Sequence, residues 1–275
     1  MLEIVIEMFS YPFMVRAVIV GVLVALCAAL LGSSLVLKRY SMIGDGLSHV
    51  GFAALAVAYA ANLAPLSVAI PVCVVSAFIL LRMNENSRIK GDAATALMCS
   101  GALAVGVMTV SLTTGMNTDV CNYMFGSILA MSKTDVQISL ILSVAVILLF
   151  LVFYHRIFAV TFDETFAKAT GTKSDIYNMI IAILTAVTVV LGMRMMGTLL
   201  ISSLIVFPSL SAMRICKKFK TVIWCSVLIS ILCFCVGIYV SYEYSTPTGA
   251  SIVIANILVF FVFLGIEHLR ERVVK

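Results

Sequence analysis

The sequence predicts an all-α integral membrane protein, a polytopic helical bundle with about eight or nine transmembrane helices. Hydrophobic residues make up 63% of its 275 residues and charged residues only 11%. A soluble domain has about a quarter of its residues charged, so this composition does not suit a water-exposed surface. The apolar residues also gather in stretches of about 20, the length that a helix needs to cross a bilayer. We expect a single transmembrane domain over residues 1–275.

Nine apolar stretches are candidate spans. In chain order they are 13–37, 43–61, 63–81, 93–112, 136–154, 176–194, 197–214, 222–241 and 249–267. The second and third are separated only around Asn62, which predicts a tight hairpin, and the sixth and seventh only at Met196 and Gly197. Because a member of either pair can be broken rather than fully spanning, eight spans remain an alternative. Residues 117–134 are too short and mixed to span, and they fit a re-entrant or interfacial helix.

Lysine and arginine set the expected orientation, because cytoplasmic loops of membrane proteins carry an excess of them. With the loop 82–92 placed inside, 15 of the 18 basic residues fall in or beside inside regions, which leaves Arg16, Lys133 and Arg194 outside. Nine spans then give an external N-terminus and a cytoplasmic C-terminus, whereas eight spans move one end. The net charge of +5 does not indicate a nucleic-acid partner, because the basic residues lie in short loops without interleaved aromatic residues.

The eight cysteines fall mostly inside apolar runs, where a free cysteine packs as a small apolar side chain. Cys233 and Cys235 form a CxC pair, but there is no second pair at zinc-site spacing, so packing is favoured over metal binding. Glu3 and Glu7 precede the first span where a secretory signal would be basic, so we expect no cleavable signal peptide.

Asp45 and His49 stand out because ionisable side chains inside a bilayer are costly and usually functional. The sequence embeds no other acid or histidine in an apolar stretch. Four residues apart, they share one helix face, and a carboxylate with an imidazole suits Zn²⁺, Mn²⁺ or Fe²⁺. Two copies across a two-fold axis would supply four ligands. Alternatively, Asp45 caps the helix and His49 bonds a carbonyl group. Ser41 and Ser48 are expected to form interhelix hydrogen bonds, with support of the metal ligands as the alternative.

The cytoplasmic connection 155–175 is long for a link between spans and predicts a short amphipathic helix ending at Gly171. Phe162, Phe166 and Ala169 fall on one face, which fits docking on a cytoplasmic partner. A helix lying on the lipid surface is the alternative. The sequence has no GxxxxGK[ST] phosphate loop and no GxSxG or HExxH motif, so we expect no enzyme activity here and any ATP hydrolysis on another chain.

The run LVLKRYSMIGDGLSHVGFAA (35–54) resembles the signature of the permease subunits of bacterial zinc, manganese and iron ABC importers, the ABC-3 metal permease family. Further stretches that resemble this family, in the same order, are NYMFGSILA (122–130), FDETFAKATG (162–171), GTLLISSLIVFPSLSAM (197–213) and SYEYSTPTGASIVI (241–254). The resemblance covers most of the chain. It departs at Gly46, where the family often has alanine, and in the following VGFAA, which more often contains proline.

This resemblance implies the membrane-spanning permease subunit of an ATP-driven importer of Zn, Mn or Fe in the bacterial plasma (inner) membrane. It implies a homodimer with a cytoplasmic ATP-binding subunit, an extracellular metal-binding protein and surrounding membrane lipid, and no permanently bound cofactor. It makes Asp45 and His49 the metal-binding residues. The residues it assigns to the ATPase-coupling contact are Asp163, Glu164, Phe166, Ala167 and Gly171. The alternatives are a proton-coupled secondary cation transporter using the same pair, an ABC permease for an organic cofactor or metal chelate, a membrane-embedded enzyme, and a scaffold.

Overall fold

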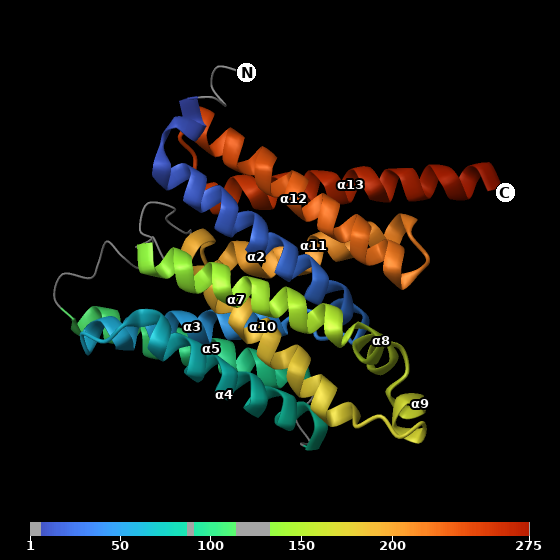
Figure 1. Cartoon of the computed structure of the whole chain (residues 1–275), viewed down its shortest axis with the longest axis horizontal. Coiled ribbons are helices and arrows are strands. Elements are labelled where there is room, and N and C mark those ends of the chain that lie inside the picture. Colours follow the sequence, from blue (N-terminus) through green and yellow to red (C-terminus); the bar gives the residue numbers. More distant parts are fainter. Residues whose placement is uncertain (1–6, 87–90, 114–132, 275) are drawn as a thin grey trace.

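The computed structural model describes residues 7–86, 91–113 and 133–274, and the regular elements in these ranges are all α-helices (Figure 1). They are α2 (Pro12–Leu37), α3 (Ile43–Ala60), α4 (Pro65–Asn86), α5 (Gly91–Leu112), α7 (Lys133–Val152), α8 (Tyr154–Phe162), α9 (Glu164–Ala169), α10 (Ser174–Met196), α11 (Thr198–Ile215), α12 (Phe219–Tyr244) and α13 (Thr248–Val274). The segment 117–134, predicted to form a re-entrant or interfacial helix, lies outside the described residues except at its last two positions, and so does the stretch 122–130 within it.

Each of the nine apolar stretches forms a helix, and eight of these helices within the described ranges are long and apolar enough to cross a membrane. The ninth, α11, has a shorter apolar stretch, Leu200–Ile215. It follows α10 after a single residue, Gly197, whose φ of +87° turns the chain sharply. The prediction of a polytopic all-α membrane bundle is confirmed, and the uncertainty between eight and nine spans lies at α11.

The long helices form two groups joined by a central set. α3, α4 and α5 pack together along one edge of the bundle, and α12 and α13 along the other, with α2, α7 and α10 between them (Figure 1). α11 contacts α3 as well as α12 and α13, so it connects the two groups. Its side chains Leu200, Ile201 and Leu204 are fully buried. A short helix is therefore stabilised at the centre of the bundle by packing against α2, α3, α10, α12 and α13.

Small residues bring α2, α11 and α12 close together. A Cβ at Gly32 of α2 would lie only 2.0 Å from the carbonyl oxygen of Ile205 in α11. Beside this contact, the hydroxyl oxygen of Ser209 in α11 lies 3.4 Å from that of Ser33 in α2 and 3.2 Å from that of Ser226 in α12. Lipid tails are as apolar as leucine, so helices in a bilayer associate through such close backbone approach and interhelix hydrogen bonds.

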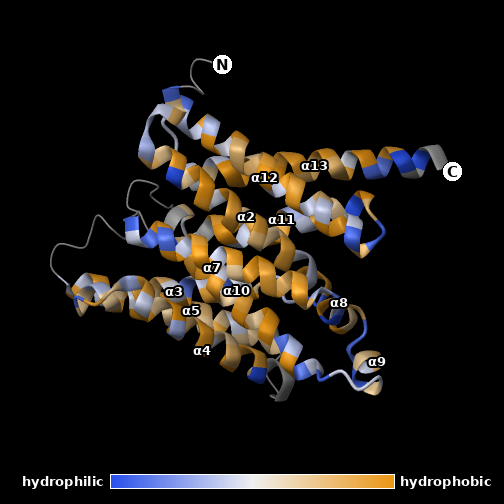
Figure 2. Cartoon of the chain, viewed as in Figure 1, coloured by the Kyte–Doolittle hydropathy of each residue, from blue (hydrophilic) through white to orange (hydrophobic). Residues whose placement is uncertain are grey.

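The chain ends and connections agree with alternating spans. The C-terminal ends of α2, α4 and α11, the short helices α8 and α9, and the end of α13 all lie at the right-hand end of the bundle in Figure 1. Hydrophilic residues gather at the two ends of the bundle and apolar residues fill the length between them (Figure 2). That the right-hand end is cytoplasmic stays a prediction from the distribution of lysine and arginine.

The connection 155–175 differs from its prediction. One amphipathic helix ending at Gly171 was expected, but two helices form, α8 and α9, with a break at Asp163 (φ −148°, ψ 95°). The Asp163 carboxylate accepts a hydrogen bond of 2.8 Å from the backbone N–H of Phe166, so it caps α9. Aspartate competes for local backbone donors in this way and starts a new helix. Gly171 has φ +83° and ends the segment as expected.

Candidate metal site and coupling segment

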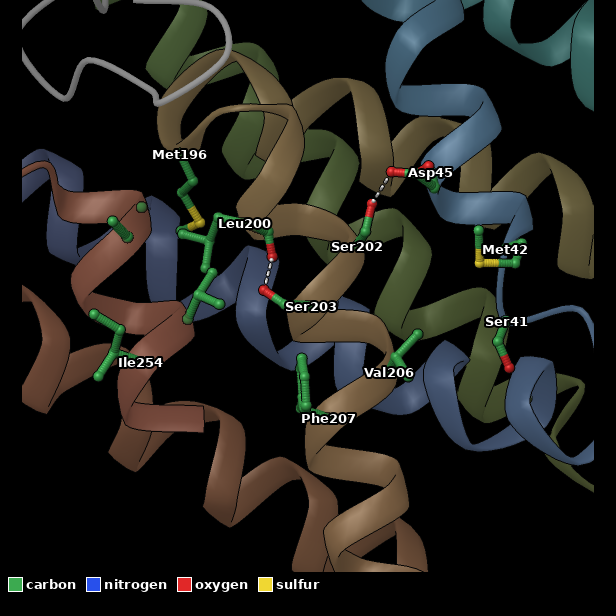
Figure 3. Close-up of a pocket in the computed structure, with 13 residues that line it drawn as sticks. Ser41, Met42, Asp45, Met196, Leu200, Ser202, Ser203, Val206, Phe207 and Ile254 are labelled. Carbon is green, nitrogen blue, oxygen red and sulfur yellow. Dashed lines mark hydrogen bonds between the residues drawn. The ribbon is translucent and has the colours of Figure 1, made fainter. Parts of the chain in front are cut away.

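Asp45 lies in the first turn of α3, immediately after the turn that leaves α2. The N-cap of α3 is Met42, and no side chain caps the helix there. The Asp45 carboxylate instead reaches across to α11, where its Oδ1 accepts a hydrogen bond of 3.3 Å from Ser202 Oγ (Figure 3). The alternative interpretation of Asp45 as a helix cap is therefore wrong, because its side chain serves a contact between helices.

His49 follows one turn later on the same face of α3. Its Nε2 lies 3.9 Å from Asp45 Oδ1, and the two side chains are 16% and 32% exposed, respectively. This separation is too long for a direct hydrogen bond. The i, i+4 spacing nevertheless places the imidazole and the carboxylate side by side, close enough for one small ion to contact both.

Cys99 of α5 completes a group of three possible metal ligands. Its Sγ lies 3.9 Å from Asp45 Oδ2, and one ligand atom from each of Asp45, His49 and Cys99 can be chosen so that all three are within 4.8 Å of one another. The sequence predicts Cys99 to be a packing residue, because nothing local distinguishes it from the other cysteines in apolar runs. The packing of α5 against α3 reveals its place.

The partners of Asp45 on α5 and α11 lie well inside their helices. Cys99 is eight residues from the start of α5 at Gly91, and Ser202 is thirteen residues from the end of α11 at Ile215. At a rise of about 1.5 Å per residue these positions are about 12 and 20 Å from the predicted cytoplasmic end. Asp45 reaches the same place from the first turn of α3, two residues after that helix begins at Ile43.

A cavity of about 580 Å³ adjoins Asp45 (Figure 3). It lies between the start of α3, the first half of α11 and α13, and its walls are mostly apolar, with Met196, Phe207 and Ile254 among them. Ser41 lines it too. Ser48 does not form the expected interhelix bond, because its hydroxyl donates to the Asp45 carbonyl oxygen in its own helix at 2.7 Å. An ion held by Asp45 thus has open space on the α11 and α13 side.

The segment expected to contact an ATPase has one strongly exposed apolar side chain among the five named residues. Phe166 is 66% exposed, whereas Ala167 is buried. Asp163 is used as the cap of α9, and Gly171 supplies the positive φ that ends the segment. Phe158 and Phe162 of α8 stack against Phe219 at the start of α12, with ring centroids 5.1 and 5.6 Å away. α8 is therefore anchored on α12, and α9 presents Phe166 outward.

Glu164, the remaining residue of that set, points inward. Its Oε2 lies 3.1 Å from Lys38 Nζ at the end of α2 and accepts a 3.2 Å hydrogen bond from Asn178 of α10, and its Oε1 lies 3.1 Å from Lys168. Burial acts to raise the pKa of Glu164, but the hydrogen bonds from Asn178, Lys168 and Lys38 and the charge of Lys38 outweigh it and hold the pKa below its ordinary value of 4.5. The carboxylate thus ties α9 to α2 and α10.

Asp45 is not the only acid in the interior. Asp135 of α7 and Arg194 of α10, of which Arg194 is expected outside from the distribution of basic residues, form an ion pair of 2.7 Å with side chains only 11% and 12% exposed. Each lies near a span end, so the sequence alone did not suggest burial.

Cys233 is buried and Cys235 exposed, so the CxC pair points to different sides of α12, as packing requires.

The chain is similar to known transport proteins. Residues 10–267 match the ABC 3 transport family. The chain is 33% identical over 264 residues to a probable iron transport system membrane protein of Haemophilus influenzae, covering 95% of this chain and 93% of that one. It is 27% identical over 266 residues to the manganese import system permease protein ScaB of Streptococcus gordonii, covering 97% and 95%. Among solved structures, PsaBC from Streptococcus pneumoniae in complex with Fab has a TM-score of 0.85 and 27% identity, covering 95% and 94%.

Proposed function

The chain belongs to the ABC 3 transport family, and on that premise we propose that it is the membrane-spanning permease subunit of an ATP-driven importer of a divalent transition metal in the bacterial plasma membrane. The observation that carries the choice of cargo is the pairing of Asp45 with His49 on one face of α3, with Asp45 also lining a cavity. Relatives named for manganese and iron transport support the same class of cargo.

Asp45 and His49 are the residues that hold the metal in passage. A carboxylate oxygen and an imidazole nitrogen bind borderline divalent ions, and their partial exposure leaves the ion able to enter and leave. Ser202 fixes the carboxylate through Oδ1. Hydrogen bonds of this kind to a ligating group orient it, and their loss commonly lowers metal affinity about 10–100-fold. The cargo is bound transiently.

Energy comes from a separate cytoplasmic ATP-binding subunit that contacts α9 and the residues around it, 163–171. Phe166 provides an exposed apolar anchor suited to a groove on that partner. The Lys38–Glu164 ion pair passes a displacement of α9 to the end of α2, and the linker 38–42 connects that end directly to α3 and Asp45. A homodimer of this chain and an extracellular metal-binding protein complete the importer.

Whole-cell metal content tests this function. A host without its own metal importers would express the chain together with its neighbouring ATPase and binding protein, and the metals would be measured by mass spectrometry. We expect one transition metal to rise with the wild type and not with Asp45→Asn or His49→Ala. His268→Ala, which removes an exposed histidine at the end of α13, is the matched control and should behave as the wild type.

Two further experiments test the energy source of transport separately from the identity of the cargo. An ATPase subunit unable to hydrolyse ATP should abolish accumulation, whereas an uncoupler applied with ATP maintained should not. The opposite pattern would favour a proton-coupled transporter that uses the same two residues. If no metal rises, or if both site variants match the wild type at equal expression, the metal-import proposal is wrong.

A further inference from the structure

A thiol stands beside the carboxylate and imidazole of the proposed metal site. We infer that Cys99 is a third ligand of the transported ion and that the site therefore prefers Fe²⁺ or Zn²⁺ to Mn²⁺. This inference rests on the proposed function and deepens it, because it narrows the cargo to ions that accept a sulfur ligand. It also changes the ligand count, since one chain then supplies three donors from α3 and α5.

The donor geometry is close to that of a bound ion. Cys99 Sγ and His49 Nε2 each lie 3.9 Å from an oxygen of Asp45. Around a tetrahedral zinc ion with Zn–S of about 2.3 Å and Zn–N and Zn–O of about 2.0–2.2 Å, neighbouring ligand atoms are about 3.4–3.6 Å apart. The two contacts of Asp45 need to shorten by only a few tenths of an ångström. The ligand atoms of His49 and Cys99, which lie within 4.8 Å of each other, need to approach by at most about 1.2 Å.

Cys99 differs from the cysteines that merely pack. Cys27 and Cys73 are fully buried, and their thiols donate to backbone carbonyl oxygens of Ser143 and Leu47. Cys99 is only partly buried, and its thiol donates to a carboxylate oxygen that is itself a candidate ligand. The thiol group is therefore directed into the site and lies where an ion would meet it.

Ligand chemistry gives the selectivity. Thiolate is a soft donor that suits zinc and iron, whereas Mn²⁺ prefers carboxylate, carbonyl and water oxygen. The general order of affinity also places Mn²⁺ below Fe²⁺ and Zn²⁺ for a site of mixed nitrogen, oxygen and sulfur donors. A site of three protein ligands keeps one position open, as catalytic zinc sites do, so the ion can exchange rather than stay trapped.

The test compares metals in competition. The complete importer, in cells without other importers, would be supplied with equal Mn²⁺, Fe²⁺ and Zn²⁺, and accumulation measured for the wild type, Cys99→Ser and Cys235→Ser. We expect the wild type to favour Fe²⁺ or Zn²⁺. Cys99→Ser should lower that preference over Mn²⁺ by about tenfold or more, the usual scale for weakening a metal site. Cys235→Ser removes an exposed thiol of α12 and should leave the preference unchanged.

The outcomes distinguish this inference from the function on which it rests. If Asp45→Asn abolishes accumulation but Cys99→Ser keeps the wild-type preference, or if the wild type favours Mn²⁺, then the cysteine inference is wrong and the metal-import function stands. If Asp45→Asn and His49→Ala both accumulate metal as the wild type does, both the inference and the function are wrong.

A spectroscopic measurement does not depend on transport. Purified complete importer titrated with Co²⁺ alone should show a thiolate-to-metal charge-transfer band that is present in Cys235→Ser and absent in Cys99→Ser. A band that persists in Cys99→Ser, or a wild type without any band, would overturn the assignment of Cys99 as a ligand.

Discussion

Gly32→Ala should destabilise the bundle far more than its size suggests. The new Cβ would lie 2.0 Å from the Ile205 carbonyl oxygen and 2.8 Å from Ser209 Oγ, where ordinary contact begins at 3.4 Å. The nearest atom belongs to the backbone of α11, so no side-chain rotation relieves the clash. α2 and α11 must therefore separate by about 1.4 Å along this contact, in an interior with little free volume.

The stability lost in Gly32→Ala follows from two opposing effects. Overpacking of a close interior contact costs about 1–3 kcal/mol, and a backbone clash belongs at the upper end. Replacing glycine by alanine within a helix returns about 1 kcal/mol through helix propensity. The net loss of about 2 kcal/mol lowers the ratio of folded to unfolded protein about thirtyfold. For a chain of this size it corresponds to a decrease of about 4–8 °C in melting temperature.

The assay is thermal denaturation of the purified transporter, followed by the loss of the monodisperse peak in size-exclusion chromatography. Gly265→Ala is the matched control, because a Cβ at Gly265 of α13 meets nothing within 4 Å. We expect this control to melt at the wild-type temperature or slightly above. A Gly32→Ala protein as stable as Gly265→Ala would refute the argument that this close approach of α2 and α11 limits side-chain size.

Three further predictions concern charges and a turn. Arg194→Met removes the cation that faces the buried Asp135 carboxylate, so melting should reveal a loss of about 3–5 kcal/mol, largely recovered when Asp135→Leu is added. Glu164→Gln weakens the contact with Lys38 and should lower metal uptake per ATP hydrolysed while hydrolysis continues. The lowered pKa of Glu164 means that the stability from this carboxylate is present above pH 4.5 and lost as pH falls through the folded-state pKa. The melting difference between wild type and Glu164→Gln should thus stay constant from pH 8 to pH 5 and shrink below pH 4.5. Gly171→Ala, at φ +83° in open space, should cost about 1–2 kcal/mol from backbone strain alone.

The helices could be predicted from the sequence because their signals are local. Each of the nine predicted apolar stretches forms a helix in the described part of the chain, and the turn at Gly197 was marked by the short gap between two stretches. The break at Asp163 was missed, because the apolar pattern continues from Phe162 to Phe166 while the capping side chain changes the backbone direction. Periodicity reports which side chains share a face, and it does not report where one helix stops and the next begins.

Only the part of the site that lies on a single helix, α3, could be predicted from the sequence. Asp45 and His49 were found because their i, i+4 spacing is visible in the sequence. Ser202 and Cys99 were missed, since they reach the carboxylate from α11 and α5 and nothing local marks their contact. Arg194 was placed at a span end, and its burial against Asp135 depends on how α7 and α10 pack. Contacts between helices are properties of the assembled bundle.

The serine chain between α2, α11 and α12 has a consequence for motion. In both hydroxyl pairs, Ser33 with Ser209 and Ser209 with Ser226, either oxygen is able to act as the donor. Such contacts can reverse their polarity or exchange partners when one helix slides along another, without leaving a polar group unsatisfied in lipid. Large interdigitated leucine side chains would instead clash with one another during the same displacement. These serine contacts therefore allow α2, α11 and α12 to shift relative to one another with little change in their hydrogen bonding, as a transport cycle requires.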